Sequence, residues 1–186
     1  MAKRAPNRRI VTGINKDGRH VVISDGPTPN VYGDPADPIL INFWSTSQMP
    51  VDYRDPTDPA AGTMPLHPPP MGSMFRFFRV PPESRMAHLS AEERDRIVGA
   101  YYANVGAAHA HIPGARHAGF HRTESVDYII LLQGEVTLML DDEDVPMQPF
   151  DVVIQRGTNH SWVNYGDETA TLMAVLLSAE APDQAT

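Results

Sequence analysis

The sequence contains no cysteine, and this absence excludes several kinds of chemistry. With no Cys among 186 residues, disulfides, cysteine-ligated zinc sites, iron–sulfur clusters and cysteine nucleophiles are ruled out. Any catalytic or metal-binding group must therefore use oxygen or nitrogen atoms. Long apolar runs are missing as well, since no stretch approaches the ~18 residues that a membrane-spanning helix needs. We therefore expect no membrane partner.

Positive charge is also scarce. The chain has 15 Lys and Arg against 23 Asp and Glu, which gives a formal net charge of −8. Phosphate binding needs a basic face, so nucleic acid is not an expected partner. The N-terminal residues lack the apolar segment of a secretory signal. We therefore expect a cytoplasmic protein.

The remaining composition is that of an ordinary folded domain. The chain is 41% hydrophobic and 20% charged, and its length suits one compact domain with a core of its own. We expect a single domain over residues 1–186. Within it we expect N-terminal strands and a Pro-rich loop over 1–89, a helix over 90–105 and a barrel over 115–178.

Short β-rich segments separated by turn residues predict an all-β barrel or sandwich. We expect a loop over residues 25–38 and a solvated acidic turn over 141–144. We expect strands over residues 9–12, 20–24, 39–45, 73–80, 128–132, 135–140, 151–155, 160–164 and 171–177.

Proline is concentrated in one stretch. Nine of the 18 prolines fall between Pro50 and Pro82, and Pro donates no hydrogen bond to a sheet. We therefore expect a long loop over residues 49–72. A loop of this length inside one domain is typical of a lid, a cavity mouth or a subunit contact.

One helix is predicted after this loop. Ser90 followed by Glu93 forms the pattern of a capping box, so the helix should run from residue 91 to residue 104. Ile97, Tyr101 and Val105 fall on one side at helical spacing.

Two C-terminal segments are apolar at every position. Residues 128–132 and 172–177 therefore predict strands that are buried on both faces, and something must cover the outside of the barrel. We expect a homodimer with the N-terminal region at the contact.

Two stretches in the C-terminal half carry a spaced pattern of polar residues and glycines. In the first, five residues separate His121 from Asp127, and six separate Asp127 from Gly134. The second stretch contains Gly157, His160 and Asn164.

In order and spacing these stretches resemble the paired motifs of the cupin superfamily, whose members are small jelly-roll β-barrels, mostly with one metal ion inside. The match departs from the family pattern at three positions. Asp127 stands where the family has Glu, Thr123 replaces the second His, and Gln155 replaces a Pro. The resemblance implies an all-β cupin jelly-roll β-barrel, here with an N-terminal strand extension, a long Pro-rich loop and one short helix.

The resemblance implies that His121, Asp127 and His160 are the catalytic residues and form a 2-His-1-carboxylate metal site. Such a site suits a divalent metal ion such as Fe, Mn, Zn or Ni. On a straight strand His121 and Asp127 would lie ~20 Å apart, so the chain must turn between them. The implied activity is that of a dioxygenase, decarboxylase, lyase or isomerase on a small organic molecule.

Two alternatives remain open at this point. In the first no metal is bound, His121 or His160 is the base, and Asp127 orients it as a His–Asp acid/base pair. In the second the barrel holds a small ligand without chemistry. Under all three readings the substrate pocket is expected to include Thr123, Glu124, Gln155 and Trp162.

Two further groups of residues are weaker candidates. His109, His111 and His117 precede the first motif and offer an extra ligand or a proton shuttle, or belong simply to a loop. Four arginines are candidates to bind a substrate carboxylate through paired hydrogen bonds. Each of them is alternatively an ordinary surface charge. The candidates are Arg76, Arg79, Arg122 and Arg156.

Overall fold

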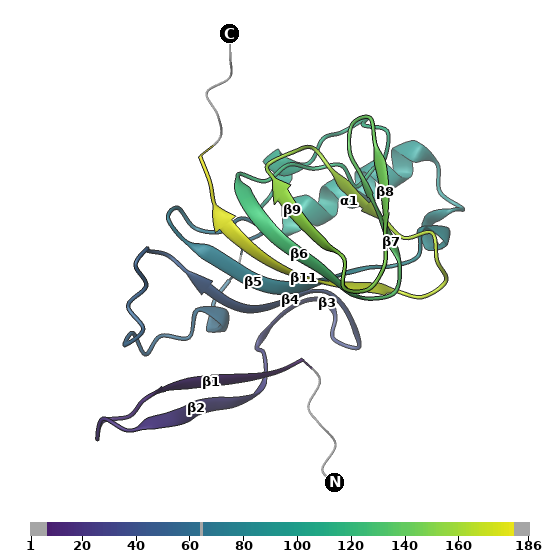
Figure 1. The fold of residues 1–186 in the computed structure, drawn as a ribbon. Helices are drawn as coiled ribbons and strands as arrows, with labels where there is room; N and C mark the ends of the chain where they lie inside the picture. The colour runs from purple at the N-terminus through teal and green to yellow at the C-terminus, as the bar shows by residue number, and fades with distance from the viewer. Residues whose placement is uncertain (1–6, 64, 181–186) are drawn as a thin grey trace.

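A computed structural model describes residues 7–63 and 65–180 as three antiparallel sheets and one α-helix (Figure 1). The helix is α1 (Ala91–Asn104). The strands are β1 (Arg8–Ile14), β2 (His20–Pro27), β3 (Asn30–Asp34), β4 (Asp37–Thr46), β5 (Ser73–Val80), β6 (Ser125–Gln133), β7 (Val136–Met139), β8 (Asp144–Met147), β9 (Val152–Arg156), β10 (Ser161–Val163) and β11 (Ala170–Ser178).

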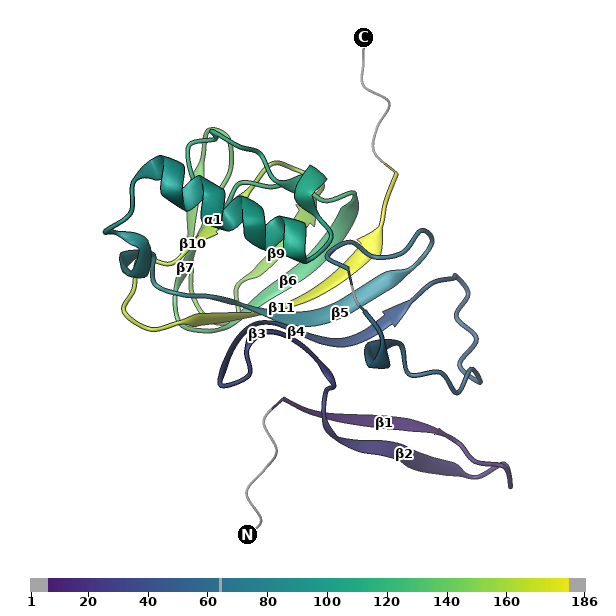
Figure 2. The ribbon, with the colours of Figure 1, turned by 180° about the vertical axis from the view of Figure 1, so that it is seen from behind.

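Two sheets face each other and enclose the core. The larger has six strands in the order β3-β4-β5-β11-β6-β9, and the smaller has three in the order β10-β7-β8. Helix α1 lies on the side of the molecule seen in Figure 2 and covers the space between the sheets. The β1–β2 hairpin forms a separate two-stranded sheet. The predicted all-β jelly-roll architecture, with its N-terminal strands, long loop and single helix, is confirmed.

Alternation along the strands places every second side chain inside. In β6 the inward positions are Ser125, Asp127, Ile129 and Leu131, whereas Tyr128 on the other face is exposed. The register of β5, β11 and β6 aligns inward residues in rows across the sheet. Successive rows are Phe78–Leu172–Leu131, Arg76–Ala174–Ile129 and Met74–Leu176–Asp127.

Helix α1 has the predicted bounds and capping box. The Ser90 hydroxyl accepts from the backbone N–H of Glu93, whose carboxylate accepts from the backbone N–H of Ser90. The predicted face is buried in part: Val105 is buried, whereas Ile97 is 45% exposed. Tyr102, next to the predicted Tyr101, is buried as well.

One expectation about loops was wrong, and one strand beside a correctly predicted turn was missed. Residues 25–38 contain β3, which pairs with β4. The register of this pair shifts at Gly33, whose φ of 102° is a backbone conformation that favours glycine. The turn over 141–144 ends where β8 begins at Asp144. Pro146 obscured this strand in the sequence, but β8 lies at a sheet edge, where Pro is tolerated.

The Pro-rich loop contains no strand in its described part and is fixed at several points. A short 3-10 turn (Pro59–Ala61) follows Asp58, whose carboxylate accepts from the buried Arg9 at 2.8 Å. Its Leu66 donates a backbone hydrogen bond to Val105 at the end of α1. The loop is therefore bound to both the N-terminal hairpin and the helix. Its predicted role as a lid or subunit contact stays a prediction.

Apolar side chains remain exposed on the outer surface. They lie on the β1–β2 hairpin and on the outer face of β6 and β9, and include Ile10, Val22, Ile23, Tyr128, Val152 and Ile154. Variants of these residues can test the homodimer prediction, which stays a prediction. No helix in residues 7–63 and 65–180 is long and apolar enough to cross a bilayer.

Candidate functional site

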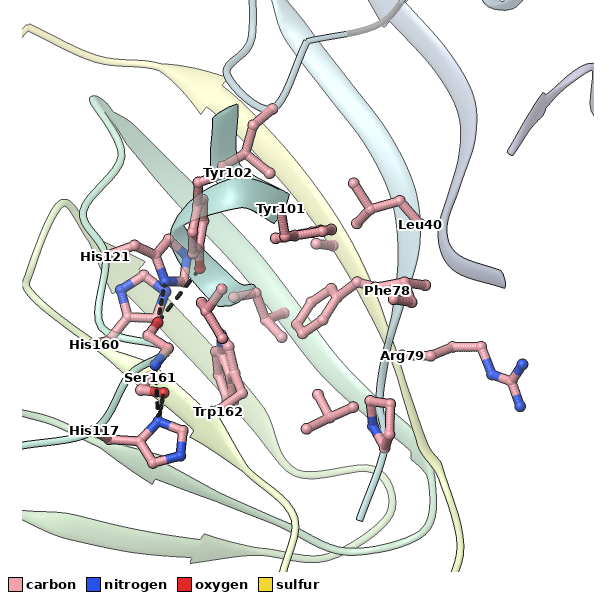
Figure 3. A pocket seen from close by; sticks show the side chains of 18 of the residues that line it. Leu40, Phe78, Arg79, Tyr101, Tyr102, His117, His121, His160, Ser161 and Trp162 are labelled. Atoms are coloured by element: carbon pink, nitrogen blue, oxygen red, sulfur yellow. Dashed lines mark hydrogen bonds between the residues drawn. The ribbon is translucent and has the colours of Figure 1, made fainter. Parts of the chain in front are cut away.

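A cavity of about 420 Å³ lies between the two sheets beneath α1 (Figure 3). Both sheets and the helix contribute to its lining, so segments far apart in the sequence meet there. Its apolar wall includes Leu40, Phe78, Tyr101, Tyr102 and Trp162. Aromatic and aliphatic walls of this kind suit a small organic molecule.

The two predicted histidines lie side by side on this cavity. The backbones of His121 and His160 exchange hydrogen bonds of 2.9 and 3.0 Å, which sets the two residues opposite each other. Their ring centroids are 4.2 Å apart, and His160 and Trp162 pack edge to face. The backbone pairing of His121 with His160 therefore brings both imidazoles to one place.

Backbone carbonyls fix the tautomer of each ring. Nδ1 of His121 lies 3.0 Å from the carbonyl oxygen of Gly119, and Nδ1 of His160 lies 2.9 Å from that of Thr158. Because a carbonyl only accepts, each Nδ1 carries a proton and donates it. Nε2 of each neutral ring therefore keeps its lone pair.

Burial keeps both imidazoles neutral. It lowers the pKa of His160 to about 4. It also lowers the pKa of His121 well below the ordinary value, and the neighbouring His160 adds to this effect. Two neutral imidazoles with Nε2 lone pairs can accept protons or hold a metal ion.

Asp127 is buried in the same cavity but does not contact the histidine rings through a hydrogen bond within the described chain. Burial raises the pKa of its carboxyl to about 6, against the opposing effects of the Ser125 hydroxyl, Arg76 and the Thr123 hydroxyl. Its Oδ1 is buried without a hydrogen-bond partner among the described residues. The predicted role of Asp127 in orienting a histidine was wrong, because carbonyl groups orient both rings.

The described residues do not fit a preformed 2-His-1-carboxylate site. No group of three His, Asp or Glu side chains in residues 7–63 and 65–180 is arranged to hold a metal ion. Asp127 has a shorter side chain than the family's Glu. Thr123, at the second His position, is buried and accepts a hydrogen bond from Ser125. Metal uptake by His121 and His160 stays a prediction.

The four residues expected in the substrate pocket divide into two pairs. Thr123 and Trp162 line the cavity. Glu124 is exposed to solvent. Gln155 is buried, but its amide donates to Thr158, and neither residue belongs to the cavity lining.

Three other motif residues shape the fold around the site. Gly134 has a φ of 81°, and a Cβ there would lie 2.9 Å from the Cα of Ala170. Gly157 also has positive φ, at 60°. Asn164 is 1% exposed and donates its amide to the carbonyls of Val80 and Glu168. These residues position the strands rather than contact a ligand.

A chain of hydrogen bonds that was not foreseen supports His121. Nδ1 of His117 accepts from the Gly119 N–H at 3.0 Å and from the Ser161 hydroxyl at 2.8 Å. Its proton therefore lies on Nε2, 3.3 Å from a Glu83 carboxylate oxygen. Because the Gly119 carbonyl holds His121, this chain fixes the His121 ring. Glu83 and Ser161 gave no signal in the sequence, since their partners are distant along the chain.

The other two histidines of the predicted cluster go elsewhere. His111 donates to the carbonyl of Ala118 at 2.9 Å and stacks on Tyr102. His109 stacks on His67, with ring centroids 4.7 Å apart. The predicted cluster of three histidines is therefore not assembled around the cavity, and only His117 lines it.

The four candidate arginines also separate. Arg76 is 2% exposed and lines the cavity. The head of Arg79 points away from the cavity (Figure 3) and pairs with Asp37 at 2.5 Å. Arg122 and Arg156 are exposed and do not line the cavity. The surface interpretation of Arg76 was therefore wrong.

Comparison with known proteins agrees with the predicted resemblance. Residues 108–176 match the family model of the cupin domain. This part of the chain contains both motifs and is similar to cupin domains.

Three curated relatives match over shorter stretches. The chain is 47% identical over 62 residues to phomopsin biosynthesis cluster protein C' of Diaporthe leptostromiformis, which covers 33% of this chain and 32% of the relative. It is 44% identical over 46 residues to oryzines biosynthesis cluster protein J of Aspergillus oryzae (24% and 26%). It is 40% identical over 45 residues to a cupin-domain-containing oxidoreductase of Aspergillus ruber (24% and 22%). The chain therefore spans a third or less of the length of these relatives.

Among solved structures, a Cupin 2 conserved barrel domain protein from Salinispora arenicola superimposes with a TM-score of 0.37. It is 19% identical, and the match covers 80% of this chain and 87% of that one.

Proposed function

We propose that the cavity binds a small, largely apolar organic molecule and that His121 and His160 move a proton on it without a metal. The observation that carries this proposal is the tautomer of the two rings: each donates its Nδ1 proton to a backbone carbonyl. This leaves two Nε2 lone pairs on neutral, buried imidazoles beside an apolar wall. General bases of this kind contribute about 10²–10⁴-fold to a rate.

The reaction class is that of an isomerase or lyase. Nε2 of one ring takes a proton from a C–H bond next to an electron-withdrawing group, and the electron pair of that bond forms a new double bond. Return of the proton at another atom gives an isomerisation. Departure of a leaving group with an electron pair gives an elimination.

The names of the relatives support a small-molecule substrate. Two of them belong to the phomopsin and oryzines biosynthesis clusters. The matched regions are short, so this support concerns the class of ligand and not its identity.

The proposal can be tested with a general probe of base catalysis, 5-nitrobenzisoxazole. Removal of the proton on C3 of its isoxazole ring forms a nitrile and breaks the N–O bond, and the opened ring is a coloured phenolate. Metal-stripped wild-type protein should accelerate this reaction. His121→Asn and His160→Asn should each lower the catalysed rate at least tenfold, because an Asn amide replaces the Nδ1–H donor without a basic Nε2.

The matched control is His20→Ala on β2, an exposed histidine outside the cavity, which should react at the wild-type rate. Because burial lowers the pKa of His160 to about 4, the rate should persist well below pH 6.5. Equal rates in all three variants, or a rate that depends on added metal, would contradict the proposal.

A second candidate is a metal-dependent oxidoreductase. The short separation of the two imidazoles, 4.2 Å between ring centroids, favours it, as does the name of the Aspergillus ruber relative. Metal content of untagged protein distinguishes the two candidates. Near-stoichiometric Fe, Mn, Ni or Zn that is lost in His160→Asn would favour the metal enzyme. Less than a tenth of an equivalent after incubation with these metals would favour the metal-free reaction.

A further inference from the structure

Arg76 is a buried cation whose hydrogen bonds are mostly unmet. It lies on β5 at an inward position and lines the cavity. Its Nη2 donates to the carbonyl of Pro65 at 2.8 Å. Nε and Nη1, which carry three of the five guanidinium N–H bonds, are buried without an acceptor among the described residues.

Nothing in the described chain neutralises this charge through an ion pair. The nearby Asp127 carboxyl forms no salt bridge with Arg76 in residues 7–63 and 65–180. Arg9 provides the contrast, since it is also buried but pairs with the carboxylate of Asp58. Burial lowers the pKa of Arg76 only to about 10, so the side chain stays charged at neutral pH. An unpaired buried charge is costly, and an anionic ligand would remove this cost.

We propose that Arg76 binds the carboxylate of the molecule that occupies the cavity, which makes the substrate an apolar organic acid. This inference rests on the proposed function and adds the chemical class of its substrate. A single carboxylate fits the lining, because the cavity offers one buried guanidinium, while both imidazoles are neutral and the buried carboxyl of Asp127 supplies no second cation. A phosphate dianion would require more cationic partners.

The position of Arg76 also orients the ligand. It lies in the six-stranded sheet, in a row with Ala174 and Ile129, and the small side chain of Ala174 leaves space beside it. His160 comes immediately before β10 of the opposite sheet. An acid held by Arg76 therefore extends across the cavity toward the imidazoles, between the aromatic walls.

The first test compares three probes on the wild-type protein. Cinnamate carries a carboxylate and an apolar body, cinnamamide has the same body without the charge, and acetate has the charge without the body. By calorimetry, cinnamate should bind at least tenfold more tightly than either of the others. Cinnamamide that binds as tightly as cinnamate would overturn the role of charge. Acetate that binds as tightly would show a site for simple anions and overturn the substrate class.

The second test uses variants. Arg76→Met should weaken cinnamate binding at least tenfold and leave cinnamamide binding unchanged. Arg79→Met is the matched control, because Arg79 lies on the same strand with its head directed away from the cavity, and it should bind cinnamate like wild type. Cinnamate binding by Arg76→Met within twofold of wild type would overturn the proposal.

A third variant separates this inference from the proposed function. His160→Asn should retain cinnamate binding while it loses proton-transfer activity. If the proton-transfer test fails but cinnamate is still preferred through Arg76, the acid–base function is wrong and the carboxylate site stands. If proton transfer depends on the histidines but Arg76→Met binds cinnamate normally, the carboxylate site is wrong and the acid–base function stands.

Discussion

The same strands build two different ends of one barrel interior. In the row Phe78–Leu172–Leu131 the two leucines are fully buried and pack as apolar core. Two rows further along, β6 presents Asp127 at the equivalent inward position. Because inward positions recur every second residue, a short step along β6 separates packed core from cavity. The comparison shows that one sheet carries tightly packed leucines and, two rows away, the buried carboxyl that lines the cavity.

The largest effect is expected at the apolar end. Leu172→Ala should lower the free energy of unfolding by about 2–5 kcal/mol, because it removes a fully buried side chain and leaves a void. Urea denaturation measures this loss. Thr171→Ala, on the opposite face of β11, is the control and should cost far less. A loss under about 1 kcal/mol for Leu172→Ala would contradict the tight packing of this end.

At the polar end, Asp127→Asn should stabilise the protein at pH 8. The pKa of Asp127 is raised to about 6, so the protonated carboxyl favours folding. This stabilisation is complete at a pH below the ordinary pKa of an aspartate and is lost as the pH rises through 6. The variant should therefore gain roughly 2–3 kcal/mol at pH 8 and little at pH 4. Unfolding curves at both pH values measure the difference. An equal change at both would show that titration of Asp127 is not involved.

Arg76→Met should also increase stability, by about 1 kcal/mol, because it removes an unpaired buried charge and keeps an apolar side chain of similar length. The gain is measured by urea denaturation without ligand. A clear loss of stability would instead show that the hydrogen bond to Pro65 holds the loop more strongly than the buried charge opposes folding.

The smallest effect on the protomer is expected outside the barrel. Ile154→Glu on the outer face of β9, where Ile154 is 53% exposed, should change the stability of the protomer by about 0.5 kcal/mol or less. If this face contributes to a homodimer contact in addition to the predicted N-terminal region, light scattering should show a dimeric wild type and a monomeric variant. A monomeric wild type, or a variant that remains dimeric, would contradict that contact.

Much of the fold could be predicted from the sequence because its signals are local. The capping box at Ser90 fixed the start of α1, and alternation with turn residues located most strands. β3 and β8 were missed because each is short and contains a residue typical of loops, Gly33 in β3 and Pro146 in β8, although each pairs with its neighbour along the chain, β4 and β7. The exposure of Ile97 was not predicted, because helical spacing defines a face without showing how far each of its residues is covered.

The site was predicted only in part, for the same physical reason. Motif spacing identified His121 and His160, which the fold does bring together. Arg76 was ambiguous, because both faces of β5 carry apolar residues and the sequence does not show which face is inside. The groups that orient the imidazoles are mainly backbone carbonyls, which leave no trace in residue identity.

The central claim is that His121 and His160 are neutral and carry their protons on Nδ1. Long-range ¹H–¹⁵N NMR of the imidazole rings, followed from pH 8 to pH 4, tests it most directly. The account predicts that Nε2 of both rings is unprotonated at neutral pH and that His160 gains its second proton only near pH 4. A ring that carries its proton on Nε2, or titration of His160 near pH 6.5, would contradict it.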